Sequence, residues 1–210
     1  KEIQFYEFQQ LMFQRQWKKL KEYANSQGIK IIGDIPIYVA FDSADSWSRP
    51  ELFQFDNNNQ PEAVAGCPPD AFSETGQLWG NPLYDWKYHK KTGFSWWMRR
   101  MKYCFGLYDV VRIDHFRGFD EYYTIPAKEE TAVNGTWKKG PGISLFKKMK
   151  RTFRELNIIA EDLGFLTPSV YKLLEDTGFP GMKVLQFAFS TQDRSTYLPY
   201  FYSHNCVVYT

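Results

Sequence analysis

The sequence predicts an α/β fold built on a parallel β-sheet. Five short apolar runs have the length and β-branched content of buried strands: 29–33, 109–113, 157–160, 183–189 and 205–209. Segments with helical periodicity lie between several of them, as in sheets whose parallel strands are joined by crossover helices. Acidic residues follow or end the first three runs, namely Asp34, Asp114 and Glu161. Because the active sites of (β/α)₈ barrels gather at the carboxyl ends of the strands, we expect a partial (β/α)₈ TIM-type barrel.

Five strands are too few to close such a barrel, so the chain is expected to be its central part, incomplete at both ends. A doubly wound open sheet is the alternative, although no Gly-rich phosphate-binding motif follows any of the runs. The chain starts at Lys1 inside a helical pattern, which suggests a piece of a longer protein.

Helices are predicted between the strands from apolar residues at 3–4 spacing. Residues 2–27 carry Phe13, Trp17, Leu20 and Ala24 on one stripe, and Gly28 follows as a stop. Further helices are expected at 42–47, 85–105, 144–156 and 167–175.

A long insertion at about 50–85 is rich in Pro, Gly and Asn. We expect Leu52–Phe55 to pair with Ala63–Ala65 around the turn at Asn57–Asn59. Loops of this length are usually functional or disordered, and the aromatic content argues against disorder. An ordered substrate loop and an aromatic-stapled structural loop are both consistent with the pattern.

Composition narrows the function classes. The net charge is +2 with charges that look scattered, so no nucleic-acid partner is expected. No apolar stretch is long enough to span a membrane, and Cys67, Cys104 and Cys206 fit free thiols in a reducing cytoplasm. Aromatic residues reach 19%, which suits a groove that holds sugars. The oligomeric state stays open.

The stretch YDVVRIDHFRGF (108–119) contains the main candidate site. Arg112 and Asp114 are two positions apart in a strand, so they share one face. Asp114 is then a nucleophile kept ionised by its cationic neighbour, or one half of a structural ion pair. Glu161 among apolar residues is a candidate acid/base with a raised pKa, and spacing leaves Asp162 open for that role. A pair of acids flanking one bond is what retaining glycoside cleavage needs. Divalent metal binding is the weaker alternative, and no metal site is expected.

Four motifs in order, GDIPIYVAFDSADSW, PPDAFSETGQLWGNPLYDW, RIDHFRG and IIAEDLG, resemble the 4-α-glucanotransferases, also called amylomaltases or disproportionating enzymes. The resemblance covers nearly the whole chain and implies a retaining barrel of the α-amylase-like superfamily. It implies transfer of α-1,4-glucan segments between maltooligosaccharides through a covalent glucosyl-enzyme intermediate, without a cofactor.

The resemblance also assigns roles to individual residues. It implies Asp114 as nucleophile, Arg112 as the residue that orients it, and Glu161 as general acid/base. The implied substrate-binding residues are Asp70, Phe72, Gln77, Trp79, His115 and Phe187. Packing is the alternative role for Phe72 and Phe187.

Three departures from the family pattern qualify this assignment. Ala71 stands where many members have Tyr, and Ser190 where many have an acid. The family's third carboxylate follows a strand ending VVYT, and this chain ends at Thr210. An inactive fragment that only binds oligosaccharide is therefore one alternative, and an α-amylase-type hydrolase is another.

Overall fold

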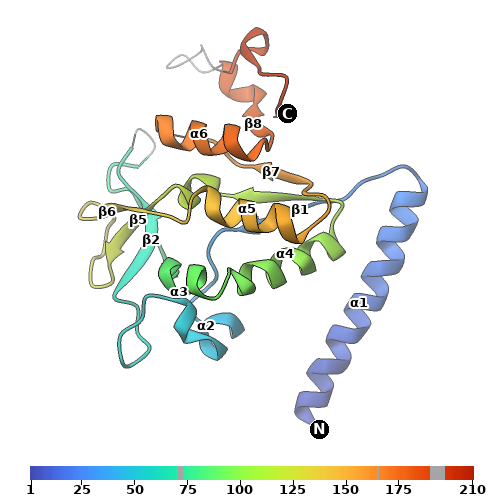
Figure 1. The fold of residues 1–210 in the computed structure, drawn as a ribbon, viewed down its shortest axis with the longest axis horizontal. Helices are drawn as coiled ribbons and strands as arrows, with labels where there is room; N and C mark the ends of the chain where they lie inside the picture. Colours follow the sequence, from blue (N-terminus) through green and yellow to red (C-terminus); the bar gives the residue numbers. More distant parts are fainter. Residues whose placement is uncertain (71–72, 165, 190–196) are drawn as a thin grey trace.

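The computed structural model describes residues 1–70, 73–164, 166–189 and 197–210. At its centre lies a parallel sheet of order β1–β4–β7 (Figure 1), formed by β1 (Ile32–Pro36), β4 (Val110–Asp114) and β7 (Ile158–Ala160). The strands expected at 109–113 and 157–160 are thus confirmed. The first strand begins later than expected, so that Asp34 lies inside it rather than beyond its end, and Pro36 is its last residue.

The two faces of this sheet differ in character because side chains alternate along each strand. Val111 and Ile113 of β4 are fully buried on one face, where the helices pack. Arg112 and Asp114 are only partly buried on the other. The register aligns Asp34 with Arg112 and so brings charged residues of two strands onto this second face.

A second parallel pair is formed by β8 (Gly181–Val184) and β9 (Cys206–Tyr209). The expected strand 183–189 is wrong in its second half, where Leu185–Phe189 forms a 3₁₀ helix. The apolar alternation of this segment is compatible with either conformation. β8 is tied to β7 by a hydrogen bond from Ala160 N to the Pro180 carbonyl at 2.9 Å.

An antiparallel sheet that the sequence analysis did not predict has the order β3–β2–β5–β6. Its strands are β2 (Ala63–Cys67), β3 (Gln77–Pro82), β5 (Glu121–Pro126) and β6 (Thr136–Lys139). The sequence predicted that Ala63–Ala65 pairs with Leu52–Phe55. This prediction is wrong, because Ala63–Ala65 pairs with β5. The insertion at 50–85 begins with a 3₁₀ turn at Pro50–Leu52, directly after α2 (Ala44–Ser48), and β2 and β3 of this sheet order its described residues.

The helices agree with the predicted positions except at one break. They are α1 (Glu2–Ser26), α3 (Trp86–Lys91), α4 (Ser95–Leu107), α5 (Ile143–Thr152) and α6 (Pro168–Thr177). The expected helix 85–105 is split into α3 and α4 because Gly93 and Phe94 both adopt left-handed backbone angles, with φ of 62° and 55°. The apolar stripe continues across the break, since Phe94, Trp96 and Trp97 are all buried.

The main core lies between the central sheet and the helices. Its fully buried side chains include Trp97 and Met101 of α4, Phe116 and Phe119 after β4, and Phe146 of α5. Their rings contact one another, with centroids 5.2 Å apart for Trp97 and Phe119. Many of the aromatic residues therefore form core, and this core supports the ends of β4 and β7.

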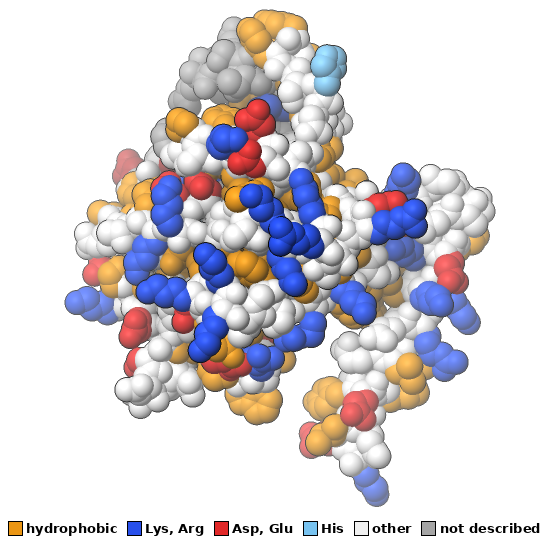
Figure 2. Space-filling view, in the orientation of Figure 1, with side chains coloured by type: hydrophobic (Ala, Val, Ile, Leu, Met, Phe, Trp, Pro, Cys, Tyr) orange, Lys and Arg blue, Asp and Glu red, His pale blue; other side chains and the backbone are white. Residues whose placement is uncertain are grey.

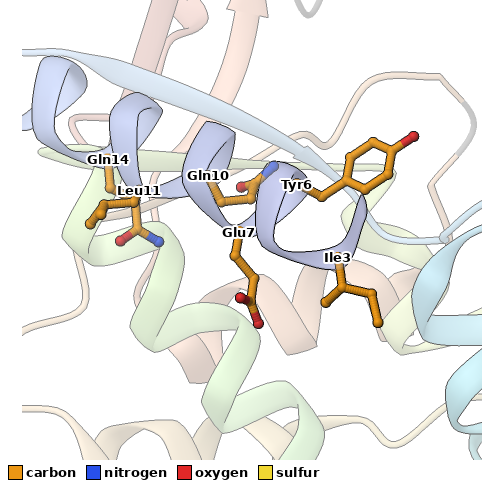
Figure 3. Close-up of a pocket in the computed structure, with 6 residues that line it drawn as sticks. All are labelled: Ile3, Tyr6, Glu7, Gln10, Leu11 and Gln14. Atoms are coloured by element: carbon orange, nitrogen blue, oxygen red, sulfur yellow. The ribbon is translucent and has the colours of Figure 1, made fainter. Parts of the chain in front are cut away.

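Helix α1 projects away from this core (Figure 1), and none of its residues is buried. Its carboxyl-terminal half is held by Trp17, whose Nε1 donates to the Leu107 carbonyl at 2.8 Å. A shallow hollow of about 490 Å³ on its other half (Figure 3) is lined by Ile3, Tyr6, Glu7, Gln10, Leu11 and Gln14. Because all six come from one helix, this hollow is a helix surface.

Charge is less evenly distributed than the sequence suggested. Segments 86–108 and 131–154 contain Lys and Arg but no Asp or Glu. Figure 2 shows the resulting gathering of basic side chains over the face that carries α4 and α5. The expectation of scattered charges is thus wrong for this face. None of the helices within the described ranges combines the length and the apolarity that crossing a membrane requires.

Candidate functional site

Arg112 lies at the centre of the charged face of the sheet and binds two carboxylates. Its Nη1 donates to Asp34 Oδ1 at 2.7 Å and its Nη2 to Asp114 Oδ1 at 2.9 Å. Such charge-assisted hydrogen bonds fix the planar guanidinium and both acids. The Asp114 side chain stays 46% exposed, so it is held at one oxygen and open to solvent. The contact with Asp34 was not predicted from the sequence, which placed this acid at a strand end and paired Arg112 with Asp114 alone.

Glu161 follows β7 directly, beside the end of β4. Its Oε2 accepts from the backbone N of His115, the residue after Asp114, at 2.8 Å, and its Oε1 accepts from Leu163 N at 2.7 Å. The backbone of Glu161 also bonds to this strand end, since its N donates to the Ile113 carbonyl at 3.0 Å. The structure thus brings Asp114 and Glu161 together at adjacent strand ends.

The environments of the two acids differ. Burial raises the pKa of the Glu161 carboxyl, and the negative charge of Asp114 acts in the same direction. The backbone N–H groups of Leu163 and His115 oppose this shift. Asp114 is more exposed and bound to a cation. One acid that retains its proton to higher pH beside one paired with a cation is an arrangement suited to acid/base and nucleophilic roles.

Asp162, the residue after Glu161, binds the backbone of β8 and does not face Asp114. Its side chain is 8% exposed and Oδ1 accepts from Met182 N at 2.6 Å, at the start of β8. Burial raises the pKa of this carboxyl as well. Side-chain alternation after β7 directs Asp162 away from Glu161 and into the junction of β7 with β8. The structure therefore favours Glu161 over Asp162 as the acid beside Asp114.

A cavity of about 510 Å³ opens next to Asp114 and His115. Its walls are the segment Pro36–Ala40 after β1, together with Trp79, Asn81 and Arg100. Arg100 fastens the backbone of that segment, since its Nη2 donates to the Pro36 carbonyl at 2.7 Å and its Nη1 to the Ile37 carbonyl at 3.1 Å. Asn81 Nδ2 binds the Val39 carbonyl at 2.9 Å. The cavity thus has a wall that side chains from β3 and α4 hold in place.

Aromatic side chains line this cavity around His115. Trp79 meets the imidazole edge to face, with ring centroids 4.8 Å apart, and Tyr38 lies 6.5 Å from it. His115 has left-handed backbone angles, φ 55° and ψ 47°, which turn the chain sharply after β4. Burial lowers the pKa of His115 to about 4, so the ring is neutral at pH 7. The neutral imidazole thus adds no charge to this part of the cavity, and its Nε2 is buried without a hydrogen-bond partner among the described residues.

The insertion contributes two more of the predicted residues. Gln77 Oε1 accepts from Trp79 Nε1 at 2.9 Å, which links both at the start of β3. Asp70 Oδ1 accepts from Ser73 N at 2.9 Å and so supports its own turn. Burial raises the pKa of the Cys67 thiol to about 11, and the charges of Asp70, Glu161 and Asp114 add to this rise. The insertion thus lies within electrostatic reach of the two strand-end acids.

Among the described residues, one predicted side chain, Phe187, is not brought to the site. Phe187 lies in the 3₁₀ helix after β8, 44% exposed, and its ring contacts Tyr197 at 5.3 Å. It lines neither the cavity beside Asp114 nor a second cavity, of about 490 Å³, whose lining includes Asp34, Arg112 and Met182. Phe72 and the departures at Ala71 and Ser190 lie outside the described residues.

Sequence reasoning missed Tyr38, Asn81, Arg100 and Met182. Tyr38 and Asn81 belong to two of the four motifs given above. Their polar side chains, next to Gly and Pro residues, could have marked them as candidates. Arg100 lies in the predicted helix 85–105 among Lys and Arg residues, a pattern typical of a solvent-exposed helix face. The sequence around Met182 contains no feature that indicates a role at the site. Within the described ranges, no group of three or more His, Cys, Asp or Glu side chains could hold a metal ion.

Comparison with known proteins identifies the family of this chain. The family model for 4-alpha-glucanotransferase matches residues 1–210. A 4-alpha-glucanotransferase of Clostridium butyricum is 53% identical over 210 residues, covering 100% of this chain and 43% of the relative. One from Streptococcus pneumoniae (TIGR4) is 56% identical over 201 residues, covering 96% and 40%.

Among solved structures, the amylomaltase from Streptococcus agalactiae in complex with acarbose superposes with a TM-score of 0.94 at 47% identity. The superposition covers 98% of this chain and 42% of that protein. The chain thus spans about two fifths of the length of the proteins it matches. Over that span the match is continuous, and the chain belongs to the 4-alpha-glucanotransferase family.

Proposed function

We propose that this chain carries the nucleophile and the general acid/base of a retaining 4-α-glucanotransferase that acts on α-1,4-glucans. The observation that carries the proposal is the junction of β4 and β7. There Glu161 is hydrogen-bonded to the residue that follows Asp114, and Arg112 holds one oxygen of Asp114. Family membership supports the same reaction class.

In the first step, Asp114 attacks the anomeric carbon of the donor glucan. Arg112 binds Oδ1, so Oδ2 forms the new bond to carbon as the glycosidic C–O bond breaks. Glu161, whose pKa is raised by burial, gives its proton to the leaving oxygen. The products of this step are a shortened glucan and a covalent glucosyl-enzyme.

In the second step, the Glu161 carboxylate removes the proton from the 4-hydroxyl of an acceptor glucan. That oxygen bonds to the anomeric carbon, the bond to Asp114 breaks, and configuration is retained. The cavity lined by Tyr38, Trp79 and His115 is where sugar rings would stack beside the reacting bond. Transfer to water in place of a sugar would be hydrolysis, which the experiment below distinguishes.

We further propose that β1, β4 and β7 are consecutive strands of a (β/α)₈ barrel, with β8 and β9 next in order. The support is the alternation of a buried face toward the helices and a charged face on the other side. On this assignment, Asp34, Arg112 and Asp114 face the barrel interior and its carboxyl end, where such enzymes place their catalytic groups.

The test uses a chimera in which this chain replaces the matched segment of the Clostridium butyricum relative, together with the 210-residue chain alone. Both are incubated with maltotriose, and chain lengths and reducing ends are followed. Glucose with longer maltooligosaccharides at constant reducing ends is expected from the chimera, whereas rising reducing ends would indicate a hydrolase. Products from the chain alone would mean that this segment suffices.

Variants of the chimera test the roles. Asp114→Asn and Glu161→Gln should each abolish transfer, and Asp176→Asn, an exposed acid paired with Lys172, is the matched control. Full activity in Asp114→Asn would refute the assignment of the nucleophile.

A further inference from the structure

The guanidinium of Arg112 has a third partner besides its two carboxylates. Its Nε lies 3.1 Å from Met182 Sδ, on β8. Each nitrogen of the fork therefore has one acceptor: Nη1 binds Asp34, Nη2 binds Asp114 and Nε binds the thioether. The three acceptors come from three different strands.

A methionine at this point has a chemical consequence. Thioether sulfur is a weak, neutral acceptor. It can satisfy the Nε–H of Arg112 without drawing the cation away from the two aspartates, as a third carboxylate would. Met182 is 7% exposed, so water has little access to take its place. Fixing the Nε corner keeps the fork from tilting about its two carboxylate bonds.

The position of Met182 is itself set by an acid beside the proposed catalytic pair. Asp162 Oδ1 accepts from Met182 N at 2.6 Å, and this bond joins β8 to the end of β7. Gly181 leaves room for that carboxylate, since a Cβ there would lie 2.5 Å from Asp162 Oδ2. Asp162, Met182 and Arg112 thus form a continuous chain of contacts that ends at Asp114.

We propose that Met182 is a positioning residue: its sulfur, held in place by Asp162, fixes Arg112 and through it the carboxylate of Asp114. The catalytic part of this inference rests on the function proposed above, whereas the contact with Arg112 can be tested without any activity.

The first measurement is NMR on the 210-residue chain. The rate at which the Arg112 Nε–H exchanges with water reports directly on its acceptor, and Arg112→Lys assigns the signal. Met182→Leu keeps the volume but removes the acceptor. We expect the Arg112 Nε–H to exchange roughly 2- to 5-fold faster in this variant, the effect of losing a modest hydrogen bond. Met182→Gln offers an oxygen acceptor and should restore the slow rate.

Asp162 provides a second pair of variants. Asp162→Asn keeps an oxygen for Met182 N, whereas Asp162→Ala removes it. The Ala variant should speed exchange at Arg112 and the Asn variant should not. Thermal melting is recorded for all four variants of Met182 and Asp162. Faster exchange at Arg112 with an unaltered melting temperature then reports loss of the contact, because partial unfolding would lower the melting temperature as well.

The second measurement is kinetics of the chimera with maltotriose. Met182→Leu should lower kcat by roughly 2- to 5-fold at unchanged KM, with recovery in Met182→Gln. Exchange that is unchanged in Met182→Leu overturns the proposal, as does faster exchange with unchanged kcat. An active Asp114→Asn would instead refute the proposed function, and it would leave the exchange result standing.

Discussion

Acidification should destabilise this protein through His89, a fully buried histidine beneath the candidate site. Its Nε2 lies 3.2 Å from the Leu52 carbonyl, and its ring meets Tyr84 edge to face at 5.3 Å. Its Nδ1 is buried and finds no hydrogen-bond partner among the described residues. A second ring proton would therefore have no acceptor, and burial lowers the pKa of His89 to about 4 from 6.5.

The sign and size of the effect follow from proton linkage. Between pH 6.5 and 4 the unfolded chain binds the proton at His89 and the folded chain does not, so stability falls as the pH falls through this window. The loss from this one group is about 2 kcal/mol between pH 7 and pH 5, and about 3 kcal/mol once the pH is below 4. At pH 7 the histidine is mostly neutral in both states, and the cost is only about 0.2 kcal/mol.

The assay is urea unfolding of the 210-residue chain at pH 7, 6 and 5, compared with two variants that cannot titrate. His89→Phe keeps an aromatic ring, and His89→Gln keeps a donor for the Leu52 carbonyl. Each variant is expected to lose about 1 kcal/mol at pH 7. Because only the wild type loses about 2 kcal/mol through this group by pH 5, the difference should change sign there, leaving each variant about 1 kcal/mol more stable than the wild type. A gap that stays constant with pH in both variants would refute this reasoning.

Three further predictions concern the site. The raised pKa of Glu161 should extend transfer activity of the chimera to higher pH than an ordinary carboxyl acid would allow, because the proton needed in the first step is retained longer; an alkaline limb near pH 4.5 would contradict this. Arg100→Met removes two bonds to backbone carbonyls at the end of β1 and should weaken the binding of maltotriose to the chimera by roughly 10-fold in calorimetry. Unchanged affinity would mean that the wall of the cavity holds without it. Gly181→Ala should destabilise the chain by about 1–3 kcal/mol in urea unfolding, since the new methyl group displaces Asp162; a neutral result would show that the junction yields at no cost.

The parts of the fold that the sequence predicted are those with a local cause. β4 and β7 are short apolar runs, and the alternation in β4 already placed Arg112 and Asp114 on one face. Two pairings of the antiparallel sheet, β2 with β3 and β5 with β6, join neighbouring segments, but the central pairing of β2 with β5 joins distant ones: Ala63 pairs with Pro126, and no local pattern predicts such a partner. Strand β3 contains Gly80 and ends at Pro82, residues that usually argue against a strand.

The candidate site divides in the same way. Asp114 and Glu161 could be proposed from the sequence because each is a charged residue at the end of a short apolar run, although Asp162 shows that such a residue can also have a structural role. Met182 could not be found, because a methionine in an apolar strand looks like core until β8 is placed against Arg112. Its contact depends on a backbone bond to Asp162. On the proposed assignment the two adjacent acids therefore have different tasks: Glu161 would serve the reaction, and Asp162 holds β8, the strand that places Met182 beside Arg112.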